Sequence, residues 1–468
     1  MRNFVLAMSS GSVALMSAMM ATGAQADDLR DAVEQDYPYI EKLYKHFHAN
    51  PELSFRESES AKRIATELEA LGFDITSNVG RKWTRKKAKA DAGEVMDGVD
   101  GYGLIAVLEN GDGPTLLIRA DMDALPLEEK TGVSYASKVV SQDYFGQEAP
   151  VMHACGHDVH MTVLVGTARQ LIEMKDQWSG TLVLVGQPAE ELGLGALAMI
   201  DDGLFSRIPQ PDHNIALHVT GLAPAGTIAY TSGNALASVD TVDVTIKGVG
   251  GHGAYPHLAV DPILIGSRIV TTLQSIVARE VNPLEAGVIT VGSFQGGYKH
   301  NIIPDEVTLK LTVRSYEDSV RDKLLDGIRR TAKAQAISAG LPEDLHPVVT
   351  IEEDNLISTY NEPGLASRVA STLEARFGQA RVSQVPPAMG GEDFAYFGKT
   401  DDEIPSLIFW LGGADPEAYA KSLSGEGPRP PSNHSPFFAP VPEPTLTTGV
   451  EAMTAAALDL LDGSSAEN

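Results

Sequence analysis

The sequence predicts an α/β protein whose main domain has a mostly parallel sheet and is interrupted by a second, α+β domain. Three observations lead to this prediction: continuous apolar runs in the first half, a change to alternating strands near residue 232, and a return to the first pattern near residue 360. Continuous apolar runs are typical of parallel strands that are buried on both faces. With 468 residues, 43% of them hydrophobic, the chain is long enough for two or three domains.

The first 26 residues have the composition of a targeting segment. Arg2 gives a weakly basic start, residues 4–21 are mostly apolar and small, and Ala24-Gln25-Ala26 fits an A-x-A cleavage signal. We expect a signal peptide over residues 1–26, cleaved near Ala26, which would make the mature protein periplasmic or secreted. A retained membrane anchor is the alternative, since the apolar stretch is close to bilayer-spanning length.

Charge and cysteine usage exclude two classes of protein. The net charge of −27 argues against nucleic acid or an anionic membrane as a partner, because phosphates would be repelled. A single cysteine, Cys155, excludes a disulfide within the chain.

The main domain is expected to begin with an amphipathic helix over about residues 29–48. Four buried strands follow at residues 104–108, 115–118, 181–185 and 215–217, with helical stretches such as 160–174 between them. Polar residues come soon after three of these strands, namely Asp121, Asp123, Glu190, Glu191 and His218. Because ligands bind outside the carboxyl ends of strands in open α/β sheets, these residues predict one shared site.

The second domain is expected to be ferredoxin-like. Strands are predicted at residues 239–246, 287–294, 306–313 and 348–352, and helices at residues 261–280 and 319–338. This βαββαβ order predicts an antiparallel sheet. The predicted boundaries are 27–231 for the first part of the main domain, 232–355 for the inserted domain and 356–468 for the remainder.

The segment 81–100 fits neither domain well. Its first nine residues include six lysines and arginines, and it continues without periodicity. We expect a solvated surface loop, with a docking patch as the alternative.

The run His153-Ala154-Cys155-Gly156-His157-Asp158 predicts a metal site. It places several possible ligands close together, and zinc and similar ions accept thiolate, imidazole and carboxylate groups in one site. A small buried hydrophobe is the alternative role for Cys155.

Adjacent carboxylates at Glu190 and Glu191 repel each other unless a cation or a proton neutralises one. One of them could bind a metal while the other accepts a proton from water. An exposed acidic helix start is the alternative for the pair. A buried carboxylate that orients a ligand imidazole suits Asp123, whereas His218 alone fits a core histidine equally well.

Several motifs together resemble the amidohydrolase branch of the aminoacylase and glutamate carboxypeptidase metallopeptidases, which includes hippurate hydrolases, N-acyl-amino-acid deacetylases and auxin-conjugate hydrolases. They are Asp121-Met122-Asp123-Ala124-Leu125-Pro126, the run from His153 to Asp158, Pro188-Ala189-Glu190-Glu191, Leu217-His218, Gly251-His252-Gly253-Ala254-Tyr255-Pro256-His257, Asn301-Ile302-Ile303-Pro304 and Gly390-Gly391-Glu392-Asp393-Phe394. They occur in the family's order over nearly the whole mature chain.

This resemblance implies a dinuclear metallopeptidase catalytic domain with an inserted lid or dimerisation domain, and a homodimer formed through the inserted domain. It implies that two divalent ions, zinc or manganese and otherwise cobalt or nickel, are held by Cys155, His157, Glu191, His218 and His434. Glu190 would be the general base.

For the remaining site residues, the resemblance implies that His252 reaches the oxyanion of a partner's site. Asn301 and Arg314 would hold the substrate carboxylate. Relative to the family pattern, segments 81–100 and 141–149 look extended and could reshape the rim of the site.

The expected activity is hydrolysis of the amide bond of N-acyl amino acids, of the hippurate or N-acetyl type. A dipeptidase or carboxypeptidase of the same family, and a non-catalytic metal-dependent binding protein for amino-acid conjugates, are the alternatives. A binding protein has no use for an uncoordinated base, so Glu190 favours an enzyme.

Overall fold

The computed structural model describes residues 11–400 and 402–462, which form two compact units. Within these residues, the larger unit comprises the chain up to Tyr230, then Gly364–Val385 and the chain from Ile404 onward. The smaller unit comprises Thr231–Pro363 and Pro386–Glu403. By comparison, the sequence prediction placed the inserted domain at 232–355.

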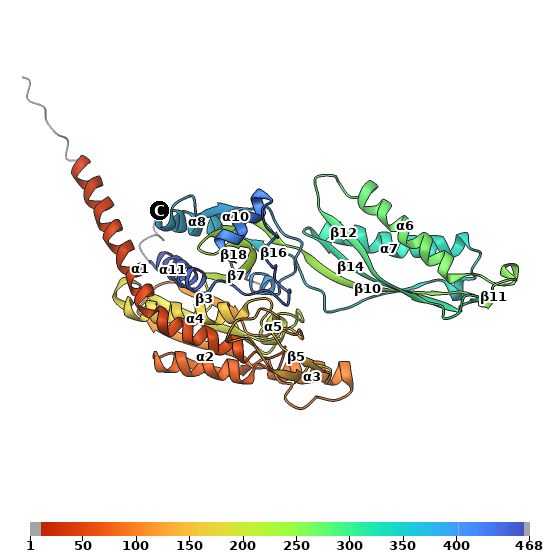
Figure 1. Ribbon diagram of the computed structural model, residues 1–468, viewed down its shortest axis with the longest axis horizontal. Helices are drawn as coiled ribbons and strands as arrows, with labels where there is room; N and C mark the ends of the chain where they lie inside the picture. The colour runs from red at the N-terminus through yellow and green to blue at the C-terminus, as the bar shows by residue number, and fades with distance from the viewer. Residues whose placement is uncertain (1–10, 401, 463–468) are drawn as a thin grey trace, which may run out of the picture. The chain divides into compact units, whose positions relative to one another are not determined.

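The larger unit is built around an eight-stranded mixed sheet (Figure 1). Its strands, in spatial order, are β1 (Asp74–Val79), β2 (Gly103–Asn110), β6 (Gly180–Gln187), β3 (Thr115–Asp121), β7 (His213–Pro224), β18 (Ser406–Ala414), β8 (Ile228–Tyr230) and β17 (Val382–Gln384). The central strands β6, β3, β7 and β18 are mutually parallel, whereas β2 is antiparallel to both of its neighbours. The predicted α/β class with a mainly parallel sheet is confirmed.

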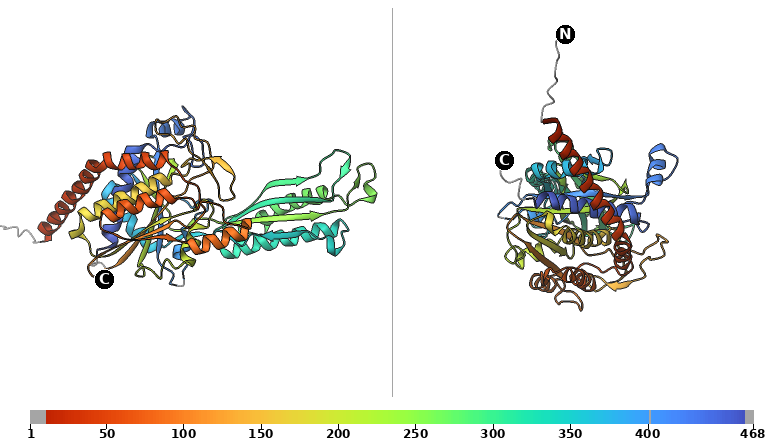
Figure 2. Two further views of the ribbon diagram at one scale, coloured as in Figure 1. Left: turned by 90° about the horizontal axis from the view of Figure 1, so that it is seen from below. Right: turned by 90° about the vertical axis from the view of Figure 1, so that its left-hand side faces the viewer.

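Helices pack on this sheet, and most of them share a continuous hydrophobic core with it. They are α1 (Gly11–Ala49), α2 (Ser58–Ala70), α4 (His157–Glu173), α5 (Gly195–Asp201), α8 (Pro363–Phe377), α10 (Pro416–Ser424) and α11 (Pro442–Leu460). Helix α4 packs against α1 and α11 (Figure 2), and nearly all of its residues are buried. The first residue of this central helix, His157, is therefore held in a rigid part of the molecule.

The predicted N-terminal elements are only partly covered by the structure. The expected helix at 29–48 is confirmed as part of α1. Of the predicted signal peptide, residues 1–10 lie outside the described residues, and residues 11–26 belong to the backbone of α1. Among the described helices, none has both the length and the apolar character needed to cross a bilayer.

The smaller unit has the βαββαβ order expected of a ferredoxin-like fold. Its elements are β10 (Ser238–Lys247), α6 (Pro262–Arg279), β12 (Gly287–Gly296), β14 (Glu306–Ser315), α7 (Asp318–Ser338) and β15 (Val348–Ile351). The sheet is antiparallel in the order β12-β14-β10-β15, and α6 and α7 pack against it and against each other. Helix α6 begins as predicted, because Asp261 accepts the amide hydrogens of Ile263 and Leu264 and proline occupies the first turn.

Shorter elements connect these units or extend them. They are β4 (Val140–Gln142), β5 (Glu148–Pro150), β9 (Gly233–Leu236), β11 (Gly251–His252), β13 (Ile302–Ile303), β16 (Thr359–Asn361), α9 (Ala395–Gly398) and three short 3₁₀ turns at residues 175–177, 256–258 and 343–345. The segment 141–149, which looked extended in the sequence, belongs to the β4–β5 hairpin.

The expectation of a surface loop at 81–100 was wrong for its first part. Residues Arg81–Ala92 form helix α3. Thr84 and Ala88 lie four residues apart and are buried, so the helix has an inward face, while most of its basic side chains are exposed. The high density of charge concealed this helical spacing in the sequence.

Candidate metal centre

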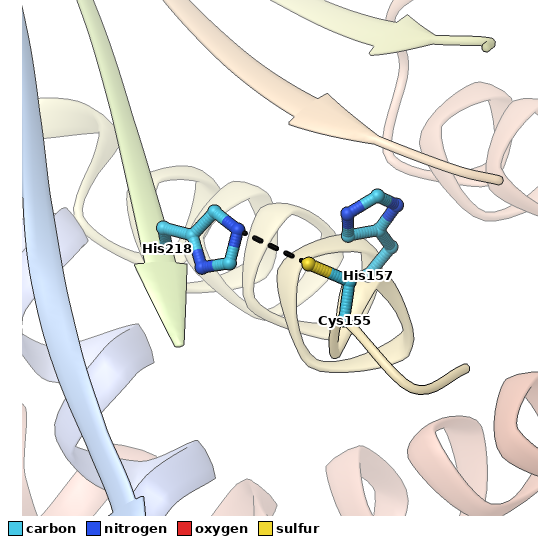
Figure 3. A group of neighbouring side chains, drawn as sticks. All are labelled: Cys155, His157 and His218. Carbon is cyan, nitrogen blue, oxygen red and sulfur yellow. Dashed lines mark hydrogen bonds between the residues drawn. The ribbon is translucent and has the colours of Figure 1, made fainter. Parts of the chain in front are cut away.

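Five predicted metal ligands converge at the carboxyl ends of the central strands in the larger unit. In each of two groups of possible ligands, the ligand atoms lie within 4.8 Å of one another, and both groups include Cys155. One adds His157 and His218 (Figure 3), and the other adds Glu191 and His434. Cys155 could therefore contribute to metal binding in both groups.

The spacing between donor atoms suits metal coordination. The sulfur of Cys155 lies 3.4 Å from Nε2 of His218, and Oε2 of Glu191 lies 3.5 Å from Nε2 of His434. Donors bound to one tetrahedral zinc ion lie roughly 3.3–3.8 Å apart, given zinc–ligand bonds of about 2.0–2.3 Å. Both pairs could therefore bind one ion each without rearrangement.

Hydrogen bonds orient the ligand atoms toward the centre. Nδ1 of His218 donates to the carbonyl oxygen of Val219 at 2.8 Å, which directs the Nε2 lone pair toward Cys155. Nδ1 of His157 lies 3.3 Å from Oδ1 of Asp123, the arrangement by which carboxylates orient metal-bound imidazoles. Among the described residues, Nε2 of His157 and Oε1 of Glu191 are buried without a hydrogen-bond partner. The donor set and these two buried atoms fit a pair of divalent cations.

The electrostatics of the site also favour a cation. Burial disfavours the charged form of His157, but the carboxylates of Asp121 and Asp123 outweigh it and raise its pKa to about 10. Burial, together with the charge of Asp123, raises the pKa of Glu191 above its usual range, although His157 opposes this. The raised pKa values favour protons on His157 and Glu191, and a bound metal ion would supply positive charge in place of these protons.

Asp123 fixes the two adjacent glutamates. Its Oδ1 accepts the amide hydrogen of Glu190 and its Oδ2 accepts that of Glu191, each at 3.0 Å, and Oδ2 also accepts the hydroxyl hydrogen of Ser54 at 2.6 Å. One carboxylate therefore contacts His157 and holds both glutamates in place. Its role in orienting ligands stays a prediction, now with a defined geometry.

Sequence reasoning missed Glu57, which supports the same turn. Ala189 has a left-handed backbone with φ of 52°, a conformation that is uncommon for a residue other than glycine. Oε1 of the buried Glu57 accepts the amide hydrogens of Ala189 at 2.8 Å and Phe55 at 2.9 Å. Phe55 also has a positive φ, so the carboxyl group of Glu57 holds two residues with left-handed backbones. One of them, Ala189, directly precedes Glu190.

Asn433 was missed as well, although it precedes a predicted ligand. Its Nδ2 donates to the carbonyl oxygens of Cys155 at 2.8 Å and Val219 at 2.9 Å, and its Oδ1 accepts the amide hydrogen of Gly221 at 3.2 Å. Its neighbour His434 donates its own amide hydrogen to Ala154 at 2.8 Å. These bonds tie together the three segments that carry Cys155, His218 and His434.

A further buried histidine, His160, is less suited to binding metal. It forms a possible ligand group with Asp121 and His157. However, its Nδ1 bonds to Asp121 at 2.6 Å and its Nε2 accepts the amide hydrogen of Val219 at 2.8 Å. Because both ring nitrogens are used, His160 supports the end of β7 next to His218.

Three predicted site residues belong to the smaller unit. His252 lies on β11, and its Nδ1 accepts the amide hydrogen of Ala254 at 3.0 Å, so the neutral ring carries its proton on Nε2. Asn301 is exposed, and Arg314 on β14 donates to the carbonyl oxygen of Met389. Their roles remain predictions.

Residues 117–457 match the family model described as "Peptidase family M20/M25/M40", which is more than half of the chain. The chain belongs to this family. The resemblance drawn from the sequence motifs is thereby confirmed, and the protein is a metal-dependent hydrolase of the amidohydrolase and peptidase type.

Similar proteins span nearly the same length. The putative amidohydrolase YhaA of Bacillus subtilis is 35% identical, over 89% of this chain and 93% of its own. Thermostable carboxypeptidase 2 of Saccharolobus solfataricus is 32% identical over 82% and 88%, and N-acetyldiaminopimelate deacetylase of Leuconostoc citreum is 32% identical over 81% and 89%. The family thus contains both amidohydrolases and carboxypeptidases similar to this chain.

A solved structure has a related fold. The crystal structure of the YXEP protein of Bacillus subtilis, described as a dinuclear metal-binding peptidase of the M20 family, aligns with a TM-score of 0.70. It is 27% identical, and the match covers 92% of this chain and 99% of that one. The fold around the candidate centre is therefore one in which a similar protein binds two metal ions.

Proposed function

We propose that the protein hydrolyses the amide bond of N-acyl amino acids with the help of two divalent cations. The observation that carries this proposal is the pair of ligand groups that share Cys155, with the carboxylate of Glu190 beside them. Relatives named as a deacetylase and an amidohydrolase support the choice of N-acyl amino acids. Zinc suits the mixed sulfur, nitrogen and oxygen donors, and manganese is the second candidate.

Each proposed ligand has a defined role. Cys155, His157, Glu191, His218 and His434 would hold the cations. When bound, the cations would polarise the amide carbonyl and lower the pKa of a water molecule. Asp123 would keep His157 oriented.

Glu190 would act as general base and then as general acid. Its Oε2 lies 3.9 Å from Nε2 of His157, and its backbone is fixed by Asp123. Glu190 is absent from both ligand groups that share Cys155, although it forms a possible ligand group with His157 and Glu191. We assign it the role of base, in which its carboxylate would accept the proton of water and pass it to the departing amine.

The smaller unit would contribute to substrate binding and to stabilisation of the transition state. His252 carries the Nε2 proton that a donor to the developing oxyanion needs, and such a contact is worth about 3 kcal/mol when it is removed. Asn301 and Arg314 would bind the carboxylate of the substrate, since the overall charge of −27 makes a local cation necessary.

A homodimer through the smaller unit is part of this proposal. Its support is a set of exposed apolar side chains within the short span 255–298, among them Tyr255, Leu258, Leu264, Phe294 and Tyr298. The ring of Tyr255 lies 5.3 Å from that of His252. Exposed large apolar side chains, aromatic ones above all, are common at protein interfaces. We also propose export, on the composition of residues 1–26.

A substrate panel tests the proposal. The protein is reconstituted with zinc or with manganese and incubated with N-acetyl amino acids, hippurate, auxin conjugates and dipeptides, and amine release is measured. We expect release from at least one class of N-acyl amino acid at a rate that a chelator abolishes. Faster cleavage of dipeptides would favour the carboxypeptidase alternative, which the carboxypeptidase relative supports. Absence of hydrolysis in all four classes would contradict an enzymatic role.

A further inference from the structure

A largely apolar cavity of about 240 Å³ lies in the larger unit next to the candidate metal centre. Glu191, a proposed metal ligand, forms part of its wall, so the cavity borders the candidate metal centre. Apolar side chains make up most of the remaining wall, including Leu53, Leu125, Tyr144, Phe145 and Leu192. Apolar walls with a few polar groups are typical of small-molecule sites.

The aromatic wall is held rigidly by the turn of the β4–β5 hairpin. The ring of Tyr144 is buried and lies 5.7 Å from that of Phe55 and 5.1 Å from that of Phe145. The Tyr144 and Phe145 rings are nearly perpendicular, at 82°, an edge-to-face arrangement that stabilises aromatic pairs. Phe145 is nevertheless 53% exposed, which leaves an apolar surface at the cavity.

Helix α3 and the segment after it support this hairpin. The hydroxyl of Tyr144 donates to Asp91 at 3.1 Å, and Tyr144 shares a small hydrophobic core with Ala88 and Val99. Arg56 donates to the carbonyl oxygens of Asp97 at 2.8 Å and Asp143 at 3.1 Å, so one side chain joins the two segments. The two segments that looked extended in the sequence, 81–100 and 141–149, thus form one structure.

The charges of the wall distinguish the two halves of an N-acyl amino acid. Among the described residues that line the cavity there is no lysine, arginine or histidine, whereas Glu191 and Asp143 are both present. The carboxylate of Asp143 accepts the amide hydrogens of Phe145 and Gln147 at 2.9 and 2.8 Å, so it is used within the hairpin turn. The wall therefore offers no cation to the carboxylate on the amino-acid half of the substrate, whereas the acyl half is uncharged and needs none.

We propose that this cavity is the acyl subsite and that it selects an apolar acyl group the size of a single aromatic ring. The proposal rests on the proposed function, because it assumes that the amide carbonyl is bound at the metal centre. The acyl group is bonded directly to that carbonyl carbon, whereas the amino-acid side chain is separated from it by the amide nitrogen and Cα. A cavity of about 150 Å³ is enough to bind benzene, so a volume of about 240 Å³ has room for one aromatic ring, and it lies below the range of about 300–1,000 Å³ that is typical for drug-sized ligands.

Steady-state kinetics with three substrates test the acyl subsite. N-benzoyl-L-alanine, N-acetyl-L-alanine and N-acetyl-L-phenylalanine are compared for the wild type, for Phe145→Ser and for Val140→Ser. Val140 is the matched control, because it lies on the same hairpin, is 59% exposed and is not part of the cavity wall. Phe145 is half exposed, so its replacement is expected to keep the fold, which circular dichroism and thermal unfolding would check.

We expect the wild type to prefer the benzoyl over the acetyl group on alanine. Phe145→Ser should lower the ratio of kcat/KM for benzoyl over acetyl by about tenfold, the size of effect that loss of an apolar pocket contact produces. Val140→Ser should keep the wild-type ratio.

Two results would overturn the acyl subsite while leaving the proposed function intact. One is an unchanged benzoyl-to-acetyl ratio in Phe145→Ser. The other is a selective loss for N-acetyl-L-phenylalanine, which would place the amino-acid side chain in the cavity. If the wild type cleaves none of the three substrates, the acyl subsite fails, and the proposed function fails as well only if all four classes of the substrate panel also remain uncleaved.

Discussion

Replacing Glu190 by glutamine is expected to lower turnover by at least about 10²-fold, as loss of a general base does. Glutamine keeps the size of the side chain and cannot accept the proton of water. The metal content should stay nearly unchanged, because Glu190 is absent from both ligand groups that share Cys155. The backbone contact with Asp123 does not involve the altered group.

The measurement pairs steady-state rates with elemental analysis of the same protein samples. Glu109→Gln is a suitable control, since it makes the same chemical change at an exposed position on β2. A rate close to that of the wild type would remove the assigned role of Glu190. Loss of one metal ion per chain would instead show that Glu190 is a ligand.

Replacing Cys155 by serine is expected to weaken the binding of both cations. Its sulfur is the donor that the two ligand groups share, so one substitution affects both sites. Loss of an outer partner of a metal ligand typically costs 10–100-fold in metal affinity, and loss of a shared ligand should cost at least as much. Turnover should fall along with metal occupancy, and excess metal should restore part of it.

Two readouts test this second prediction. Competition with a chromogenic chelator gives the affinity of each variant, and alkylation of the thiol in the wild type shows whether metal protects Cys155. Serine has the same shape as cysteine and is only slightly smaller, so thermal unfolding of the metal-free proteins should be similar. Full occupancy and full activity in the serine variant would mean that the thiol is only a packing group.

Most of the fold could be predicted because its signals are local. Continuous apolar runs marked the central strands, and the polar residues that follow them met at one edge, since the carboxyl ends of parallel strands lie together. The alternating strands and capped helix of the smaller unit were equally clear. The central strands and the βαββαβ order are therefore present in the structure where they were expected.

The rest depended on contacts that have no local signature. Glu57 and Asn433 form hydrogen bonds with backbone groups of segments far away in the chain, and no feature of the sequence around them indicates these contacts. His434 was identified only through family resemblance, because it lies in a proline-rich loop distant from the other ligands. Helix α3 was missed because its exposed basic residues concealed two buried positions, Thr84 and Ala88.

Anomalous diffraction from crystals grown with zinc would locate the cations themselves. We expect two zinc peaks per chain in the larger unit, both next to the sulfur of Cys155. One peak should contact His157 and His218, and the other should contact Glu191 and His434. A single peak, or zinc bound away from these side chains, would contradict this expectation.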